Sequence, residues 1–187
     1  MKLTNILIPL IKEEFYLLVN WIHNCPPLCV DKEKEKELNL HLSLDKKWTD
    51  FDKNLLTNHI RKSNLKNLKI FFYSLEMSDN ESVYLRSVPL KENREVYDAL
   101  EYGYKNGPNK QFFCSIEEII NKVNPNENDS VILLEVDTLI TKNNWIDLVN
   151  KKLEKSDSFW IAGSKPISYF DLNPKIKDHL NGNSIYG

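Results

Sequence analysis

The sequence lacks an apolar run that could cross a membrane. Its amino-terminal apolar stretch, Ile6–Ile11, is short and leads directly into Lys12, Glu13 and Glu14. A membrane-spanning helix needs about 20 predominantly apolar residues, and a signal peptide places its apolar core behind a basic start. We therefore expect a protein without a membrane span that is located in the cytoplasm.

An excess of charge of one sign is missing too. The 187 residues contain 25 Lys and Arg against 27 Asp and Glu, a formal net charge of -2. This balance gives no general attraction to nucleic acid or to an anionic membrane surface. Hydrophobic residues make up 41% and charged residues 28% of the chain, as in ordinary soluble domains. We expect one globular domain over residues 1–187 and no nucleic-acid partner.

Cysteine is scarce, with three residues, Cys25, Cys29 and Cys114. An odd and small number argues against a disulfide framework. His23 lies close to Cys25 and Cys29 in the sequence, and His41 is a further potential ligand for a zinc ion. Structural zinc sites, however, use a tighter arrangement of two ligand pairs. We interpret these residues as packing and loop residues and keep zinc as the alternative.

A glycine-rich phosphate loop is also absent. The chain contains no G-x-x-x-x-G-K-[ST] motif, which argues against a P-loop ATPase. Internal repeats and a low-complexity tail are missing as well.

What the chain does contain is an alternation of strand-like and helix-like segments. In order we expect a strand over Asn5–Leu10, a helix over Glu13–His23, a strand over Leu38–Leu44, a helix from Thr49 to about Lys62, and a strand over Leu68–Leu75. The second strand alternates apolar and polar residues with period two. The charged run Asp31–Glu37 is expected to be a solvated loop or a frayed helix end. This order predicts an α/β fold with a mostly parallel sheet and right-handed connections.

The second half of the chain continues the pattern. Pro108 suits the first turn of a helix, so we expect a helix over Asn109–Val123 that buries Phe112, Phe113, Ile116, Ile119 and Ile120. After it we expect a strand over Ser130–Leu134, a helix over Asn143–Lys155 and a short strand over Phe159–Gly163.

The segment Ser130–Thr138 carries the strongest functional signal. Its strand is apolar enough to be buried on both faces, as a central parallel strand is, and it leads directly into Glu135, Val136 and Asp137. Residues two apart on an extended chain point to the same face, so we expect both carboxylates to converge. Ligands of open α/β sheets bind outside the carboxyl ends of the strands. Two hard oxygen ligands there suit a divalent cation that also holds a phosphorylated substrate.

Other interpretations of the same two carboxylates stay open. Acidic residues after a strand can also be a helix cap or a solvated turn. A phosphatase with an aspartyl nucleophile is disfavoured, because the first carboxylate is a glutamate.

Several segments occur together in an order that resembles a known family. They are NILIPL (residues 5–10), YGYKNGPNKQFF (102–113), VILLEVDT (131–138) with the following NNW (143–145), FWIAGS (159–164) and HLNGNSIY (179–186). Together they resemble nucleotide-sugar-dependent glycosyltransferases of the GT-A fold, of the kind encoded by large DNA viruses such as chlorella viruses and mimiviruses. The resemblance covers most of the chain and is strongest between residues 102 and 186.

The resemblance implies a single GT-A domain that transfers a sugar, from a UDP-sugar, to a glycan or protein-linked glycan. It places Glu135 and Asp137 at the D-x-D motif that holds Mn²⁺ or Mg²⁺ against the donor diphosphate. The first position departs from the motif, since it is Glu. The resemblance implies that Asp137 binds the metal directly and that Glu135 acts through the ribose or through water. A viral member would be found in the host cytoplasm or in the virion. Only 50 residues follow Asp137, which favours a trimmed domain or a fragment of a larger polypeptide.

The resemblance also assigns the other site residues. Donor binding is implied for Pro9, Asp45, Gly107, Pro108, Asn109, Glu135, Val136 and Asp137. Sugar or acceptor binding is implied for Trp160, Gly163, Ser164, Asn181, Gly182 and Asn183. A catalytic role is implied for Asp137. Among the residues after Trp160, Asp171 and Asp178 are the candidates for a base, and His179 is a candidate base or metal ligand, with a structural or surface histidine as the alternative.

Two other function classes remain open. One is a module that binds a nucleotide sugar or a glycan without turnover, which the Glu at position 135 and the short carboxyl-terminal part favour. The other is a nucleotidyltransferase, which uses similar carboxylate–metal chemistry but is disfavoured by the missing triphosphate loop.

Overall fold

A computed structural model describes residues 1–78, 110–156, 161–163 and 184–187. These residues form a six-stranded sheet with the order β3-β2-β1-β4-β6-β5. The strands are β1 (Lys2–Leu10), β2 (Asn39–Leu44), β3 (Lys69–Ser74), β4 (Asp129–Leu133), β5 (Ile161–Gly163) and β6 (Ser184–Tyr186). The first four are parallel, whereas β6 pairs antiparallel with both β4 and β5. The predicted α/β fold with a mostly parallel sheet is confirmed, and β6 makes that sheet mixed.

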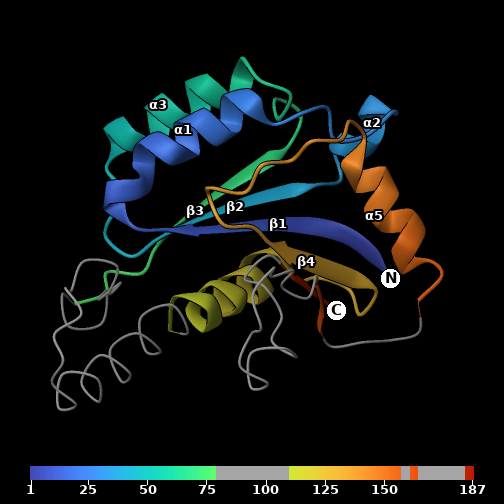
Figure 1. Ribbon diagram of the computed structural model, residues 1–187. Coiled ribbons are helices and arrows are strands. Elements are labelled where there is room, and N and C mark those ends of the chain that lie inside the picture. The colour runs from blue at the N-terminus through green and yellow to red at the C-terminus, as the bar shows by residue number, and fades with distance from the viewer. Residues whose placement is uncertain (79–109, 157–160, 164–183) are drawn as a thin grey trace, which may run out of the picture.

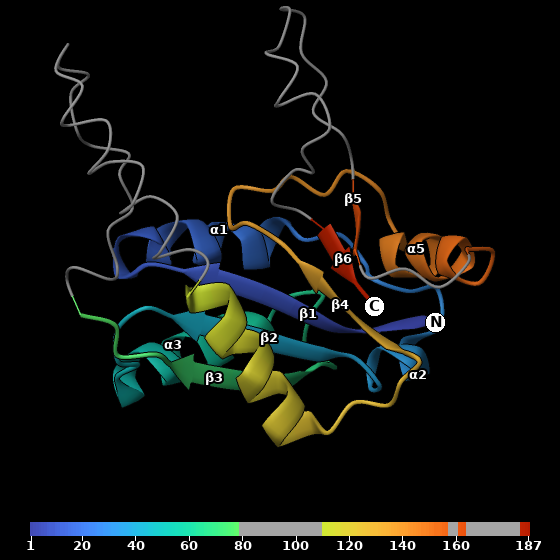
Figure 2. The ribbon, with the colours of Figure 1, turned by 90° about the horizontal axis from the view of Figure 1, so that it is seen from below.

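Helices cover both faces of the sheet (Figure 1). One face carries α1 (Phe15–Asn24), which follows the short 3-10 helix η1 (Lys12–Glu14), and α3 (Asp50–Arg61). The opposite face carries the helix over residues 110–123, which lies across β1 and β2 in the view from below (Figure 2). The other helices among the described residues are α2 (Lys32–Glu35) and α5 (Trp145–Leu153). Among the described residues, no helix combines the length and the apolar character needed to span a bilayer.

The core explains why β1 is central. Leu3, Ile6, Leu7, Ile8 and Leu10 are all buried, so side chains on both faces of the strand are removed from water. Burial of each such side chain stabilises the fold by about 1.5–3 kcal/mol. A continuous apolar run is what a parallel strand between two helical layers requires.

The start of α3 is fixed by the side chains at its amino terminus. Thr49 Oγ1 accepts the N–H of Asp52 at 3.1 Å, and Asp52 Oδ2 accepts the N–H of Thr49 at 3.3 Å. This capping box satisfies donors that a helix terminus otherwise leaves open. The same carboxylate accepts from Lys12 Nζ at 2.6 Å, which ties α3 to the segment after β1. The predicted start of this helix at Thr49 is confirmed.

The polar side of β2 differs from what its alternation suggests. Alternation of this kind is typical of a strand with one face in water, yet all six residues of β2 are buried. Ser43 Oγ lies 2.6 Å from Ser115 Oγ in the helix over residues 110–123. That helix therefore covers the polar face, on which Asn39 and His41 lie with Ser43.

The apolar face predicted for the helix over residues 110–123 is partly wrong. Ile119 is buried, but Phe113 is 67% and Ile120 53% exposed. The residues of this helix that face the sheet most closely are Gln111, Ser115 and Ile119, which follow each other at intervals of one helical turn. The polar side chains of β2 pack against polar side chains of the helix. The side of the helix that is buried is therefore not its most apolar side.

The charged run after α1 is not simply solvated, contrary to expectation. It forms α2, and Glu35 in this helix is fully buried. Lys32 Nζ donates to Glu35 Oε1 at 2.6 Å, and Asn67 Nδ2 donates to Glu35 Oε2 at 2.9 Å. A buried carboxylate needs such partners, so Glu35 anchors the run to the loop before β3.

Cys25 and Cys29 are packing residues, as predicted. Both belong to the hydrophobic core, and burial raises the pKa of Cys25 to about 12 and that of Cys29 to about 11. His41, the fourth ligand considered for zinc, has both ring nitrogens bonded within the sheet layer, to Tyr73 Oη and Asn5 Oδ1. Among the described residues, no three His, Cys, Asp or Glu side chains form a group that could hold a metal ion.

We expect Cys25 and Cys29 to resist thiol reagents in the native protein at pH 8. With these pKa values the reactive thiolate is about one molecule in ten thousand for Cys25 and one in a thousand for Cys29. Cys114 is only partly buried and should react first. Absorbance after addition of a disulfide reagent should show one fast thiol in the native protein and three in denaturant. A Cys114→Ser variant that still showed a fast native reaction would contradict the burial of the other two.

Candidate functional site

The direction in which the chain adds strands to the sheet reverses between β1 and β4. From β1 the chain adds β2 and β3 on one side by way of α1 and α3, and the helix over residues 110–123 then returns it to the other side of β1. This helix lies on the opposite face (Figure 1), as connections of one hand require when the direction reverses. The carboxyl ends of β1 and β4 therefore form a topological switch point, where α/β sheets bind their ligands.

Pro9 marks the place where β1 and β4 separate. The N–H of Leu134 donates to the carbonyl of Leu7 at 2.9 Å, whereas the carbonyl of Leu10 accepts the N–H of Asp45 at 3.3 Å. The N–H and C=O groups of successive residues in a strand point to opposite sides. Those of Leu7 point to β4 and those of Leu10 to β2, so the side of Pro9 on which an N–H is missing faces β4. The pairing with β4 has ended by then, and the proline costs no ladder hydrogen bond.

The two predicted metal ligands follow β4 in a turn. The N–H of Thr138 donates to the carbonyl of Glu135 at 3.0 Å, which closes a four-residue turn. The extended chain expected here is therefore wrong, and strand alternation does not bring the two carboxylates together. Glu135 and Asp137 are exposed on either side of the buried Val136. They remain neighbours at the carboxyl end of β4.

Asp45 lies at the same edge of the sheet. It follows β2 and is only 2% exposed, and its Oδ1 has no hydrogen-bond partner among the described residues. Burial raises the pKa of this carboxyl, although the nearby Lys46 opposes the shift. Because β1 separates β2 from β4, the ends of these two strands are two strand spacings, about 10 Å, apart. Asp45 and the turn after β4 therefore flank the end of β1.

Gln111 and Ser115 support this edge from below and were not predicted as site residues. Gln111 Nε2 donates to the carbonyl of Leu10 at 2.9 Å and to that of Ser43 at 3.1 Å. Ser115 Oγ donates to the carbonyl of Gln111 and lies next to Ser43 Oγ. The pair fixes the carboxyl ends of β1 and β2 relative to each other. The signal in the sequence was a glutamine one helical turn before a serine, on a helix whose neighbouring positions are apolar.

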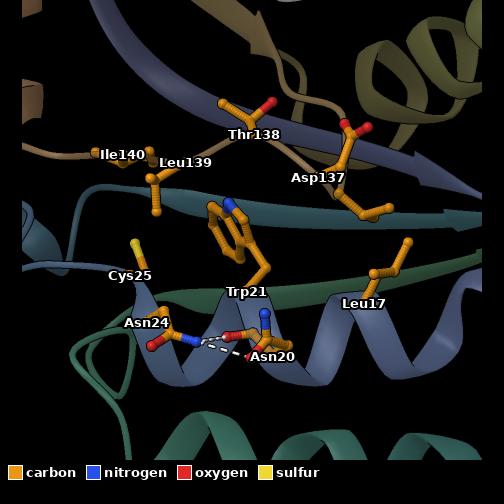
Figure 3. Close-up of a pocket in the computed structure, with 10 residues that line it drawn as sticks. Leu17, Asn20, Trp21, Asn24, Cys25, Asp137, Thr138, Leu139 and Ile140 are labelled. Atoms are coloured by element: carbon orange, nitrogen blue, oxygen red, sulfur yellow. Dashed lines mark hydrogen bonds between the residues drawn. The ribbon is translucent and has the colours of Figure 1, made fainter.

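A pocket of about 230 Å³ opens between α1 and the segment over residues 136–140 (Figure 3). It is lined by Leu17, Asn20, Trp21, Asn24, Cys25, Val136, Asp137, Thr138, Leu139 and Ile140. Asp137 lies at one end, and its carboxylate oxygens point away from Trp21 and Leu17 (Figure 3). These residues include neither Lys nor Arg, so the pocket itself does not suit a diphosphate.

The other predicted site residues are placed as far as the described residues allow. Gly163 ends β5 and pairs with Ser184, which in turn pairs with Leu133 of β4, so Gly163 lies level with the carboxyl end of β4. The following predicted residues lie outside the described residues: Gly107, Pro108, Asn109, Trp160, Ser164, Asp178, His179, Asn181, Gly182 and Asn183.

The edge of the sheet at which the parallel strands end thus brings together predicted residues from several strands. Pro9 belongs to β1, Asp45 follows β2, and Glu135 and Asp137 follow β4. Gly163 ends β5 beyond them. No protein-family model matches this chain, and its comparison with curated proteins and with solved structures also gave no match.

Proposed function

We propose that the chain is a metal-dependent glycosyltransferase domain of the GT-A type, a hexosyltransferase that moves a sugar from a UDP-sugar to a glycan acceptor. The observation that carries the proposal is the position of Glu135 and Asp137 at the switch point, across the end of β1 from the buried carboxylate of Asp45. The sequence segments that resemble the family support it independently.

The carboxylates at this edge fit a hard divalent cation. Mg²⁺ is commonly held by one or two carboxylates together with substrate phosphate oxygens, and Glu135 and Asp137 are a donor set of that kind. Mn²⁺ accepts the same oxygen ligands. A bound ion would supply Lewis-acid stabilisation of the charge on the departing nucleoside diphosphate.

Asp45 is suited to orient the donor. Its buried Oδ1 can accept a hydrogen bond from a ribose hydroxyl or a base N–H, which would relieve the cost of a buried acceptor without a partner. Gln111 holds the carbonyl group of Leu10, which also accepts the N–H of Asp45, and that of Ser43, two residues before Asp45. Asp45 therefore lies on a rigid edge, as the positioning of a substrate requires.

The alternative with a specific observation in its favour is a module that binds a nucleotide sugar without turning it over. The turn at Glu135–Thr138 keeps the two carboxylates from converging by strand geometry. Donor hydrolysis in the presence of Mn²⁺ separates the two functions, since a binding module releases no UDP. Release of pyrophosphate from a nucleoside triphosphate would instead favour a nucleotidyltransferase.

We expect UDP-sugars to stabilise the protein only when Mn²⁺ or Mg²⁺ is present. At a concentration about a hundred times its dissociation constant, a ligand that binds only the folded state adds roughly 2.7 kcal/mol to the free energy of unfolding. Thermal unfolding with a panel of nucleotide sugars, with and without the metal, measures this effect. Equal stabilisation in EDTA would rule out a metal bridge, and no stabilisation by any nucleotide sugar would contradict donor binding.

A further inference from the structure

Two histidines meet between the helices α1 and α3. His23 Nε2 lies 2.8 Å from His59 Nδ1, and the two rings stand at 90° with their centres 4.9 Å apart. The pair is exposed, so an ion in the solvent can reach it. Each histidine lies in the last turn of its helix, and helices that connect parallel strands end near the amino ends of the strands. The pair is therefore remote from Asp45 and Asp137, which follow the carboxyl ends.

The two helices hold these side chains at a fixed spacing. α1 and α3 lie on the same face of the sheet (Figure 1), and the neighbours of the two histidines, Ile22 and Ile60, are buried in one core. The ends of the helices are also connected, since Asn64 Nδ2 donates to the carbonyl of Cys25 at 2.9 Å. Two ligands on rigid, packed elements are what a preorganised metal site requires.

The distance between the two nitrogens matches neighbouring ligands of one metal ion. Imidazole nitrogens bind metals at about 2.0 Å, so two such bonds at a right angle place the nitrogens about 2.8 Å apart, and two at a tetrahedral angle about 3.3 Å. Tetragonal geometry with nitrogen ligands is typical of Cu²⁺ and Ni²⁺. To bind the ion, each ring turns so that its lone pair leaves the line between the two nitrogens, which exposed side chains can do by rotation about their side-chain bonds.

Protons and charge at the pair also permit a cation. A neutral imidazole carries its proton on either nitrogen, so the ring that now donates can move its proton to its outer nitrogen by exchange with water. Both inner nitrogens then present lone pairs, and no net proton is lost. The carboxyl ends of the two helices carry partial negative charge that favours a cation. Arg61 and Lys62 lie close by in the sequence but are exposed, so they weaken this preference without cancelling it.

We propose that His23 and His59 form a two-histidine site for a late first-row divalent cation, Cu²⁺ in preference to Ni²⁺ or Zn²⁺. Water fills the remaining positions of the ion, and Cys25 and Cys29 do not contribute, because they belong to the core. The site uses imidazole ligands where the proposed Mn²⁺ or Mg²⁺ site uses carboxylates, and it does not depend on the proposed function. The two histidines are 36 residues apart in the sequence, so a bound ion ties α1 to α3 and stabilises the folded state.

The test is a titration of the full chain with Cu²⁺, followed by electron paramagnetic resonance. Cys114→Ser is the background protein, because the thiol of this partly buried cysteine would otherwise bind or reduce the ion. The spectrum shows hyperfine coupling to each nitrogen that is bound to the ion, so it counts the imidazole ligands. We expect coupling to two nitrogens. Coupling to one nitrogen or to none in the background protein would overturn the proposal, and that result does not depend on whether any further variant folds.

Single variants identify the ligands. His23→Gln and His59→Gln should each lose the coupling to the second nitrogen and weaken Cu²⁺ binding about a hundredfold, because the effective concentration supplied by a second fixed ligand is lost. His179→Gln is the matched control and should bind like the background protein. Urea unfolding without the metal checks that the variants fold, and Cu²⁺ should raise the stability only where both histidines are present. Unchanged Cu²⁺ binding in His23→Gln or in His59→Gln would show that the ion binds elsewhere and would overturn the two-histidine site.

Discussion

Asp137→Asn is expected to abolish metal-dependent donor binding and to lower transferase turnover by several orders of magnitude. The substitution keeps the size of the side chain and removes the negative charge that would hold a divalent cation against the diphosphate. Without the cation, the charge that develops on the leaving group is not neutralised. The loss is large because electrostatic stabilisation of this kind usually contributes most to lowering the barrier of such reactions. Calorimetric titration of Mn²⁺ in the presence of UDP measures the lost affinity directly.

The free protein should tolerate this change. Asp137 and Glu135 are both exposed after β4, and two neighbouring carboxylates without a cation repel each other, so the unfolding curve should stay unchanged or shift to slightly higher stability. Glu135→Gln should have the same effects more weakly. Glu127→Gln, an exposed carboxylate before β4, is the matched control and should bind Mn²⁺ and UDP like the parent. Parent-like binding by Asp137→Asn would show that these carboxylates are structural.

The parallel part of the sheet could be predicted from the sequence because its strands are either runs of mainly β-prone residues or, in β2, an alternation with period two. β1 and the strand after residue 128 were expected within a few residues of their observed bounds, and the acidic first turn after Thr49 indicated the start of α3. β6 was not predicted, since Ser184–Tyr186 is too short to show a period. Its antiparallel pairing with β4 is decided by tertiary contacts and not by local preference.

The burial of the polar side chains of β2 could not be predicted from the sequence for a related reason. A buried Asn39, His41 or Ser43 has the same sequence pattern as a solvated one, and only the helix on that face distinguishes the two cases. At the candidate site, the family resemblance implied Pro9, Asp45 and Asp137 as donor-binding residues, and the structure has these three residues at one edge of the sheet. The turn from Glu135 to Thr138 was missed because a two-residue alternation assumes a chain that stays extended.

The second large effect concerns acid stability, which we expect to depend on His41. Its Nδ1 lies 2.7 Å from the Tyr73 hydroxyl and its Nε2 3.0 Å from Asn5 Oδ1. Asn5 Oδ1 also accepts from Asn39 Nδ2 at 3.0 Å, so it acts as an acceptor and the Nε2 of His41 carries the proton. Nδ1 then accepts from Tyr73. Burial lowers the pKa of His41 from 6.5 to about 3.

The sign of the effect follows from the protons bound in each state. Between pH 6.5 and about 3 the unfolded chain protonates this histidine and the folded protein does not, so the free energy of unfolding falls as the pH falls through that window. One pH unit corresponds to about 1.4 kcal/mol, so His41 alone should remove about 2 kcal/mol between pH 7 and pH 5. Asp45 acts in the opposite direction, because its raised pKa favours the folded state in acid.

Urea unfolding at several pH values between about 7 and 5 tests this prediction with two variants. His41→Gln replaces the imidazole with a neutral amide that can still donate to Asn5 and accept from Tyr73, so it should be less stable than the parent at pH 7 and nearly independent of pH in this window. His59→Gln changes a partly exposed histidine that is bonded to His23 and should keep the parent's slope. A parent protein with equal stability at pH 7 and pH 5, or a His41→Gln variant with an undiminished slope, would show that the buried imidazole is not the group that titrates.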